Sequence, residues 1–284
     1  MKRDLERDLA RSDGIVHRNQ LLDLGYRPSA IRYAVRVGRL LTIRREWLAA
    51  PDAPAPAIRA IKLGGRLGGA SALASYGVWV DETELIVAVS PHASRLPPLA
   101  PGEHRIALTD SCVRLDQRQW RVSLEDALLQ HARLESDLSV IASLDSAMHL
   151  HLLDRAQVSA VVRLMPERLH HIDRELDGAA MSGTESKFRV ACVRAGLRVE
   201  IQVKISRVGY VDALIDGWLI VEIDSRKHHD GQLPQHRDRV RDGHSVLEGY
   251  GHERFDYDLV QHHLDWCIQV VLARLASGRP SQAA

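Results

Sequence analysis

Residues 209–224 read GYVDALIDGWLIVEID and carry the strongest structural signal in the chain. Two apolar runs flank the turn signal Asp216-Gly217, so the sequence predicts a β-hairpin. Three carboxylates interrupt these runs, namely Asp212, Glu222 and Asp224. A carboxylate in a half-buried strand is costly to desolvate unless a partner neutralises it. Several carboxylates that converge therefore indicate a site for a divalent cation.

The length of the hairpin loop decides whether these carboxylates meet. A strict two-residue turn would put residue 212 opposite 221, and Asp212 and Glu222 would then face opposite sides. One extra loop residue, or a bulge, moves 212 opposite 222 and brings both carboxylates together. A shared site therefore requires a three-residue loop or a bulge.

The segments around the hairpin predict a mixed α/β unit over residues 181–284. Ser182-Gly183-Thr184-Glu185 marks a helix start, and Glu185 is either the partner of Ser182 in a capping box or a ligand that reaches the carboxylates. The spacing predicts a strand over 197–204, a charged helix over 237–247, a strand over 252–255 and a closing helix over 258–275. This order of elements is typical of an α/β unit with a mixed sheet.

The first fifty residues predict a winged helix-turn-helix. Short helices end at Gly25 and Gly38, and two short strands follow over 40–43 and 46–49. Residues 1–50 hold eleven Lys/Arg against six Asp/Glu, although the whole chain has a net charge of only +1. A basic second helix can contact DNA phosphates and base edges. The candidate DNA-binding residues are Arg27, Arg32, Arg36, Arg39, Arg44 and Arg45, with Arg237 and Arg241 in the C-terminal charged helix.

The middle of the chain predicts an α+β connector over 57–176. The proline-rich stretch 51–56 marks a domain edge, since proline continues neither a helix nor a central strand. A helix is expected over 70–76, strands over 85–89, 105–108 and 119–122, and helices from 123 onward. The predicted fold class is thus multi-domain α/β, with domains 1–50, 57–176 and 181–284.

Composition excludes several classes of protein. Of the 284 residues, 45% are hydrophobic and 26% charged, as in ordinary globular proteins. No apolar run has the length of a membrane span, and the first residues lack the apolar stretch of a signal peptide. Three widely spaced cysteines favour a reducing compartment over a disulfide framework. We therefore expect a cytoplasmic protein without a membrane partner.

Residues 182–260 resemble the Vsr-like branch of the PD-(D/E)XK nuclease superfamily. The shared marks are Ser182-x-x-Glu185, Ala195-Gly196-Leu197, Gln202, Val211-Asp212, Val221-Glu222-Ile223-Asp224, His228-His229 and Arg237-Asp238-x-x-Arg241-Asp242. The resemblance implies a restriction-endonuclease-like core that hydrolyses DNA with Mg²⁺ or Mn²⁺. It implies metal binding by Asp212, Glu222 and Glu185, and catalytic roles for these three together with Asp224, His228 and His229.

One departure from that family bears on activity. The family's motif lysine would stand at position 224, which here holds Asp224, as in many Vsr-like relatives. Lys204, Lys227 or a histidine are the candidates for its role.

Residues 14–50 resemble the winged helix of AbiEi-type antitoxins. The shared marks are Asp13-Gly14-Ile15-Val16, Gln20-Leu21, Gly25, Ala30-Ile31-Arg32 and Gly38-Arg39-Leu40. The resemblance implies binding to double-stranded DNA. The whole sequence most resembles proteins that join both modules in one chain.

Two functional hypotheses follow. The first is a metal-dependent DNA endonuclease that the N-terminal winged helix targets to double-stranded DNA. The alternative is a non-cleaving DNA-binding regulator, similar to an antitoxin repressor, with a degenerate nuclease fold. A homodimer and a toxin or defence-system partner stay open as further partners.

Overall fold

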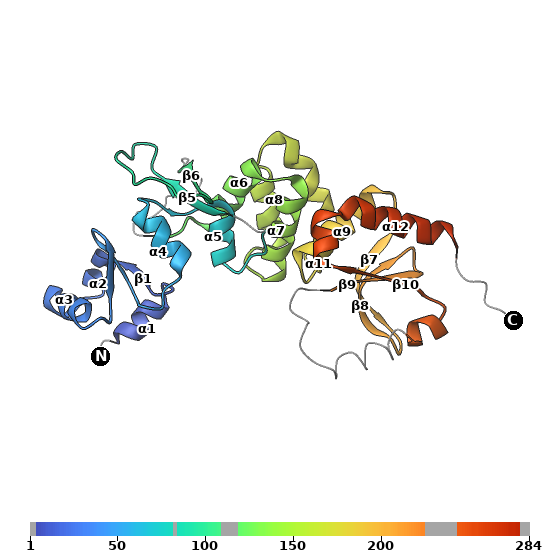
Figure 1. Cartoon of the computed structure of the whole chain (residues 1–284), viewed down its shortest axis with the longest axis horizontal. Coiled ribbons are helices and arrows are strands. Elements are labelled where there is room, and N and C mark those ends of the chain that lie inside the picture. Colours follow the sequence, from blue (N-terminus) through green and yellow to red (C-terminus); the bar gives the residue numbers. More distant parts are fainter. Residues whose placement is uncertain (1–3, 82–83, 109–118, 225–242, 279–284) are drawn as a thin grey trace. The chain divides into compact units, whose positions relative to one another are not determined.

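The computed structural model describes residues 4–81, 84–108, 119–224 and 243–278, and these form a mixed α/β fold (Figure 1). The chain divides into two compact units, Met1–Leu134 and Glu135–Ala284. The division falls inside the predicted connector 57–176, so the helices that follow Glu135 group with the C-terminal unit.

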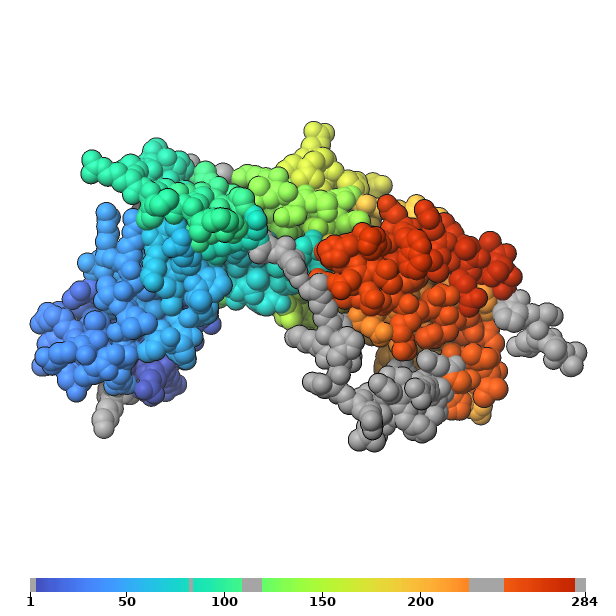
Figure 2. Space-filling view, in the orientation of Figure 1, coloured from blue at the N-terminus to red at the C-terminus, as the bar shows by residue number. Residues whose placement is uncertain are grey.

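The N-terminal unit begins with three helices and a small antiparallel sheet. The elements are α1 (Leu5–Ala10), β1 (Ile15–His17), α2 (Arg18–Asp23), α3 (Pro28–Arg36), β2 (Leu41–Arg44) and β3 (Trp47–Ala49), with the sheet order β1-β3-β2. Pro28 occupies the first turn of α3, where its missing N–H is tolerated. Ile31 and Ala34 are buried on one face of α3, and its other residues are partly or fully exposed. Figure 2 shows the surface of this N-terminal segment in blue. Strand β1 was not predicted, because three residues give too short a pattern to read.

The rest of this unit contains a second three-stranded sheet. Its elements are α4 (Ala55–Lys62), β4 (Arg66–Leu67), α5 (Gly69–Ser75), β5 (Leu85–Val89), β6 (Glu103–Ala107) and α6 (Leu124–Leu134). Strand β5 pairs antiparallel with β4 and parallel with β6. The strand predicted over 119–122 is reduced to a single bridge between Arg121 and Leu67.

The C-terminal unit places a four-stranded sheet beside a set of helices (Figure 1). Its elements are α7 (Asp137–His149), α8 (Arg155–Val162), the 3₁₀ helix η1 (Glu167–Glu175), α9 (Gly183–Arg194), β7 (Val199–Ile205), β8 (Gly209–Ile215), β9 (Leu219–Asp224), β10 (Gly251–Asp256), α11 (Tyr257–His262) and α12 (Leu264–Ala276). The sheet order is β10-β9-β8-β7, and only β10 and β9 are parallel, so the sheet is mixed as predicted. The predicted closing helix is two helices that meet at His263.

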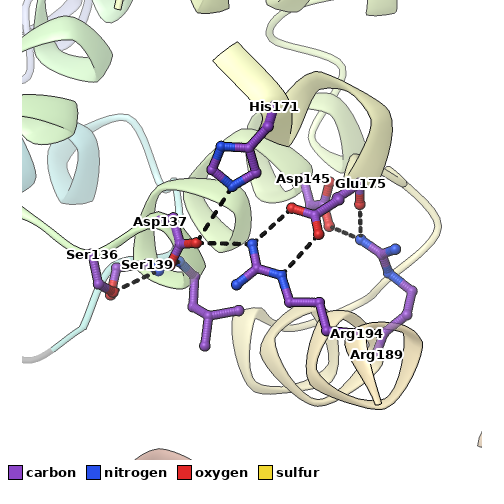
Figure 3. Close-up of polar contacts among 9 residues, drawn as sticks. Ser136, Asp137, Ser139, Asp145, His171, Glu175, Arg189 and Arg194 are labelled. Carbon is purple, nitrogen blue, oxygen red and sulfur yellow. Dashed lines mark hydrogen bonds and ion pairs between the residues drawn. The ribbon is translucent and has the colours of Figure 1, made fainter. Parts of the chain in front are cut away.

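Charged side chains tie α7 and η1 to α9 (Figure 3). Arg189 donates to Asp145 at 3.0 Å, and both side chains are buried. Arg194 lies 2.8 Å from both Asp137 and Glu175. A buried cation needs a nearby anion, because the interior does not solvate charge. These pairs explain why residues 137–175 belong to the same unit as the sheet.

Candidate functional site

The hairpin of β8 and β9 has the register that a shared acidic site requires. Ala213, Leu214 and Ile215 pair with Val221, Ile220 and Leu219, which leaves 216–218 as a three-residue loop. Asp216 and Gly217 both adopt positive φ, as a tight turn needs. The same register, continued, puts residue 212 opposite 222. The structure thus has the three-residue loop that was one of the two arrangements a shared site requires.

The two strands stop pairing just before the acidic residues. The β8–β9 ladder ends at Ala213 and Val221, although both strands continue. The next hydrogen bond runs from the Ile223 N–H to Asp212 Oδ2, at 2.8 Å. A side-chain carboxylate thus accepts a bond from the neighbouring strand's main chain. We call this position, where Asp212 lies between β8 and β9, the strand fork.

Gln202 lies across from Asp212 on β7 and has an unusual backbone. Its φ is +52°, in the left-handed region of the backbone, which residues other than glycine rarely adopt. Ile201 packs against the core beneath α9, whereas Val203 packs against the cluster that contains Ile220. Residues two apart in a strand normally share a face, so β7 changes faces at Gln202.

Strand β8 makes the same change at the matching position. Ala213 belongs to the core beneath α9, and Val211 belongs to the cluster that contains Ile220. The pairing of the two strands is kept on both sides of the change, since Ile201 pairs with Ala213 and Val203 with Val211. The change of face therefore affects β7 and β8 together, at the strand fork.

Helix α9 brings Glu185 to this fork. The Glu185 carboxylate accepts from the Met181 N–H at 3.0 Å, from Ser182 Oγ at 2.9 Å and from Gln202 Nε2 at 2.9 Å. Gln202 Nε2 also lies 3.5 Å from Asp212 Oδ1. Ser182 Oγ in turn accepts from the Glu185 N–H at 3.2 Å, as a helix cap. Glu185 therefore takes part both in the cap and in the fork.

The electrostatics of the fork favour an added positive charge. Glu185 is only 8% exposed. Burial raises the pKa of Glu185, and the negative charge of Asp212 raises it further, while hydrogen bonds from Met181, Ser182 and Gln202 oppose the rise. A cation between two such carboxylates would relieve both effects.

The donor set fits a magnesium-type ion in part. Mg²⁺ keeps several waters and is often held by one or two carboxylates together with substrate phosphate, which Glu185 and Asp212 can supply. Among the residues that the structure describes, no group of three or more His, Cys, Asp or Glu side chains is placed to hold a metal ion. Of the predicted ligands Asp212, Glu222 and Glu185, the structure joins Asp212 and Glu185 through Gln202, and Glu222 contacts a cation.

That cation is Arg254, on the parallel neighbour of β9. The register of β9 and β10 pairs Glu222 with Arg254. Arg254 Nη2 lies 3.4 Å from Glu222 Oε2, and Arg254 Nε lies 3.8 Å from Asp224 Oδ2. The side chain of Glu222 is 16% exposed and that of Arg254 is 35% exposed. One guanidinium therefore stands between the two carboxylates that end β9.

Of the residues expected to replace a motif lysine, Lys204 lies in the described part of the chain. Lys204 Nζ is 5.9 Å from the centre of the Tyr210 ring, on the β7–β8 pair. Lys227, His228, His229, Arg237 and Arg241 lie outside the described residues. Arg254 was missed in the sequence because nothing in residues 252–255 shows which strand they would pair with.

Arginines also gather in the N-terminal unit. A pocket of about 340 Å³ between α3 and the β2–β3 hairpin is lined by Arg18, Ile31, Arg32, Val35, Arg36, Thr42, Arg45 and Leu48. Three of the six predicted N-terminal arginines thus meet, and Arg18, at the start of α2, joins them. Arg39 instead pairs with Glu6 at 3.2 Å, and Arg44 contacts the Lys62 carbonyl at 3.4 Å. Arg27 caps α3 without a side-chain bond.

Comparisons with known proteins add little. Neither the comparison with family models nor that with curated proteins finds a match. Among solved structures, the chain is similar to the RV2827C protein from Mycobacterium tuberculosis, at 17% identity and a TM-score of 0.24, over 70% of this chain and 82% of that one. This likeness is too weak to carry an argument. None of the described helices is both long and apolar enough to cross a membrane.

Proposed function

We propose that this protein is a divalent-metal-dependent DNA endonuclease of the Vsr-like type. The observation that carries the proposal is the strand fork, where Asp212 lies between β8 and β9 and Gln202 on β7 links it to Glu185 on α9. The proposal includes a restriction-endonuclease-like core in the C-terminal unit and an AbiEi-like winged helix at the N-terminus, in a cytoplasmic protein.

The fork residues would share the chemistry of phosphodiester hydrolysis. Bound there, Mg²⁺ or Mn²⁺ would neutralise charge on the phosphate and make a water molecule more acidic. Asp212 is oriented by the Ile223 N–H, and Gln202 fixes the position of Glu185 relative to Asp212. The raised pKa of Glu185 makes its carboxylate a better proton acceptor than an exposed glutamate. Glu185 is thereby suited to hold and deprotonate the attacking water.

Roles for the remaining candidates stay predictions. Glu222, on the second strand of the hairpin, would bind the metal ion only after it gives up its contact with Arg254. Asp224, His228 and His229 would act near the leaving group.

The pocket between α3 and the β2–β3 hairpin would bind DNA. Arg18, Arg32, Arg36 and Arg45 concentrate positive charge beside a helix and a β-hairpin, the elements a winged helix places on duplex DNA. Replacing Arg32 and Arg36 by glutamine should weaken duplex binding and lower the salt slope by about 0.9 for each lost phosphate contact. Arg11→Gln is the matched control, because Arg11 pairs with Asp8 at 3.7 Å, is exposed and does not line this pocket. Equal losses in both variants would contradict this placement.

Cleavage is tested on supercoiled plasmid with Mg²⁺ or Mn²⁺. Wild type should nick the plasmid, and Asp212→Asn should lower the rate on the order of 100-fold or more. Asp216→Asn, in the loop of the same hairpin, should cleave like wild type. Equal nicking by the Asp212 variant would show that the activity does not come from this site.

A second candidate function rests on the Arg254 contacts. Because Arg254 occupies Glu222 and Asp224, the protein could be a DNA-binding regulator, similar to an antitoxin repressor, that does not cut. It would then bind duplex with the same salt dependence and leave the plasmid intact with either metal. Calorimetry separates the two, since a regulator should bind Mn²⁺ no better than its Asp212→Asn variant. A homodimer and a toxin or defence-system partner remain predictions.

A further inference from the structure

We propose that Arg254 is a catalytic residue that contacts the scissile phosphate. This inference rests on the proposed nuclease function and names the cation that the protein itself brings to the substrate. It starts from the register of the parallel strands, which pairs Arg254 with Glu222.

Strand geometry places the guanidinium beside the acidic residues. Neighbouring strands lie about 4.8 Å apart, and paired residues project from the same face. Phe255 belongs to the core beneath α9 and α12, so Arg254 projects from the opposite face, together with Glu222. The contact of Arg254 with Glu222 and Asp224 agrees with this placement.

The acidic side chains around Arg254 would repel a phosphate substrate, so a basic side chain among them favours its binding. Glu222 and Asp224 lie on β9, Asp256 stands opposite Asp224 on β10, and Glu185 and Asp212 lie at the strand fork. Each of these carboxylates repels a phosphodiester. Arg254 is the basic side chain that contacts two of them. A guanidinium carries five N–H donors in a planar fork, so it can hold a carboxylate and a phosphate oxygen at once.

The contacts that Arg254 makes with Glu222 and Asp224 suit an exchange of partners. Distances of 3.4 Å to Glu222 and 3.8 Å to Asp224 are longer than the 2.7–2.9 Å of a charge-assisted hydrogen bond. The Arg254 side chain is also one-third exposed, which leaves it within reach of a ligand. Phosphate binding would keep Arg254 in place and draw its charge toward the oxygens that become more negative during hydrolysis.

The test compares Arg254→Gln and Arg254→Lys with a matched control in the full-length protein. Arg274→Gln is the control, because Arg274 pairs with Glu253 at 2.7 Å on the neighbouring position of β10 and is similarly exposed. Cleavage of supercoiled plasmid is measured with Mn²⁺. The salt dependence of binding to a short duplex is measured in EDTA, where no cleavage occurs.

The expected result has three parts. Arg254→Gln lowers the cleavage rate on the order of 100-fold or more, and Arg254→Lys recovers part of it because the charge remains. Arg254→Gln also lowers the salt slope of duplex binding by about 0.9, the value of one phosphate contact. Arg274→Gln changes neither quantity.

Two results would overturn the inference. If Arg254→Gln cleaves within about threefold of wild type, Arg254 does not stabilise the transition state. If its rate falls while the salt slope is unchanged and Arg254→Lys recovers nothing, Arg254 only supports the fold. An inactive wild-type protein would instead refute the proposed nuclease function, and this inference with it, and that failure is seen before any variant is compared.

Discussion

Asp212 accepts a main-chain N–H from the neighbouring strand while it lies close enough to Glu185 to raise that residue's pKa. Two acidic groups are thus held together by hydrogen bonds although their charges repel. Sites that bind cations are commonly built in this way, at some cost in stability. The cost can be measured without substrate.

Asp212→Asn should stabilise the metal-free protein by about 0.5 to 2 kcal/mol at pH 8, the usual range for relief of a strained site. The pKa of Glu185 is raised, so its ionised form destabilises the fold, and stability falls as pH rises through that pKa. Removing the charge of Asp212 lowers the pKa of Glu185 and makes this fall smaller. Thermal unfolding in EDTA between pH 4 and pH 8 measures it. Asp216→Asn should follow wild type at every pH, and a destabilised Asp212→Asn would contradict the prediction.

The sequence identified the acidic residues but not their partners. Asp212, Glu222 and Glu185 stand out because a carboxylate interrupts an apolar run or opens a helix. The contact between Arg254 and Glu222 joins strands that a long segment separates, and no local pattern encodes such a pairing. The arginine pocket was predicted only in part. Arg32 and Arg36 follow from the pattern of helix α3, whereas no local pattern shows that Arg18, on another helix, lies beside them.

At the scale of elements, Gln202 marks the place where β7 and β8 change faces together. A left-handed residue other than glycine costs roughly 1–2 kcal/mol, and its amide bond to buried Glu185 offsets part of that cost. Alternation in the sequence predicted both strands. It could not show this change, because nothing in residues 199–205 distinguishes a regular strand from a kinked one.

Gln202→Gly should be more stable than Gln202→Ala by about 1 kcal/mol, because only glycine adopts the left-handed backbone without strain. Both variants lose the bond to Glu185, so their difference isolates the backbone. Urea denaturation measures it. The same pair of substitutions at Ile201, in the regular part of β7, should show the reverse order. An alanine variant at 202 as stable as the glycine variant would mean that the backbone there is unstrained.

The buried pair between α7 and α9 gives a second prediction at this scale. Burial raises the pKa of Asp145 to about 6, although Arg189 opposes the rise. Arg189→Met removes that opposition, so the pKa of Asp145 should rise further. An acid with a raised pKa favours folding when protonated, and stability is lost as pH rises through that pKa.

Arg189→Met should therefore cost about 3–5 kcal/mol at pH 8 and clearly less at pH 5. Chemical denaturation at the two pH values measures the difference. Arg155→Met is the control, because Arg155 pairs with Asp173 at the surface and should cost less than about 1 kcal/mol at either pH. A penalty that does not change with pH would show that Asp145 stays ionised in the variant.

At the scale of the whole molecule, the chain consists of two units that meet at residues 134 and 135. The proline-rich stretch 51–56 was interpreted as a linker or domain edge, and residues on both sides of it lie in one compact unit. Proline content shows where regular elements stop, whereas a unit boundary depends on which side chains share a core. Burial of Arg189 against Asp145 assigns α7 to the C-terminal unit.

A fragment of residues 135–284 should unfold cooperatively, whereas 181–284 should not, because the shorter fragment leaves Arg189 buried without Asp145. Circular dichroism during thermal unfolding distinguishes the two. The fragment 181–284 carrying Arg189→Met is the control, since it lacks the unpaired charge and should recover part of the structure. Equal stability of the two wild-type fragments would show that the smaller one is a complete domain.

The parallel pairing of β10 with β9 also has a consequence for biosynthesis. The hairpin can close as soon as it leaves the ribosome, because its strands are adjacent in sequence. Arg254 is synthesised only after the long segment that follows Asp224. A nascent chain therefore contains Glu222 and Asp224 before the arginine that contacts them has been made. During translation the acidic centre would thus be incomplete until the last strand, β10, pairs with β9.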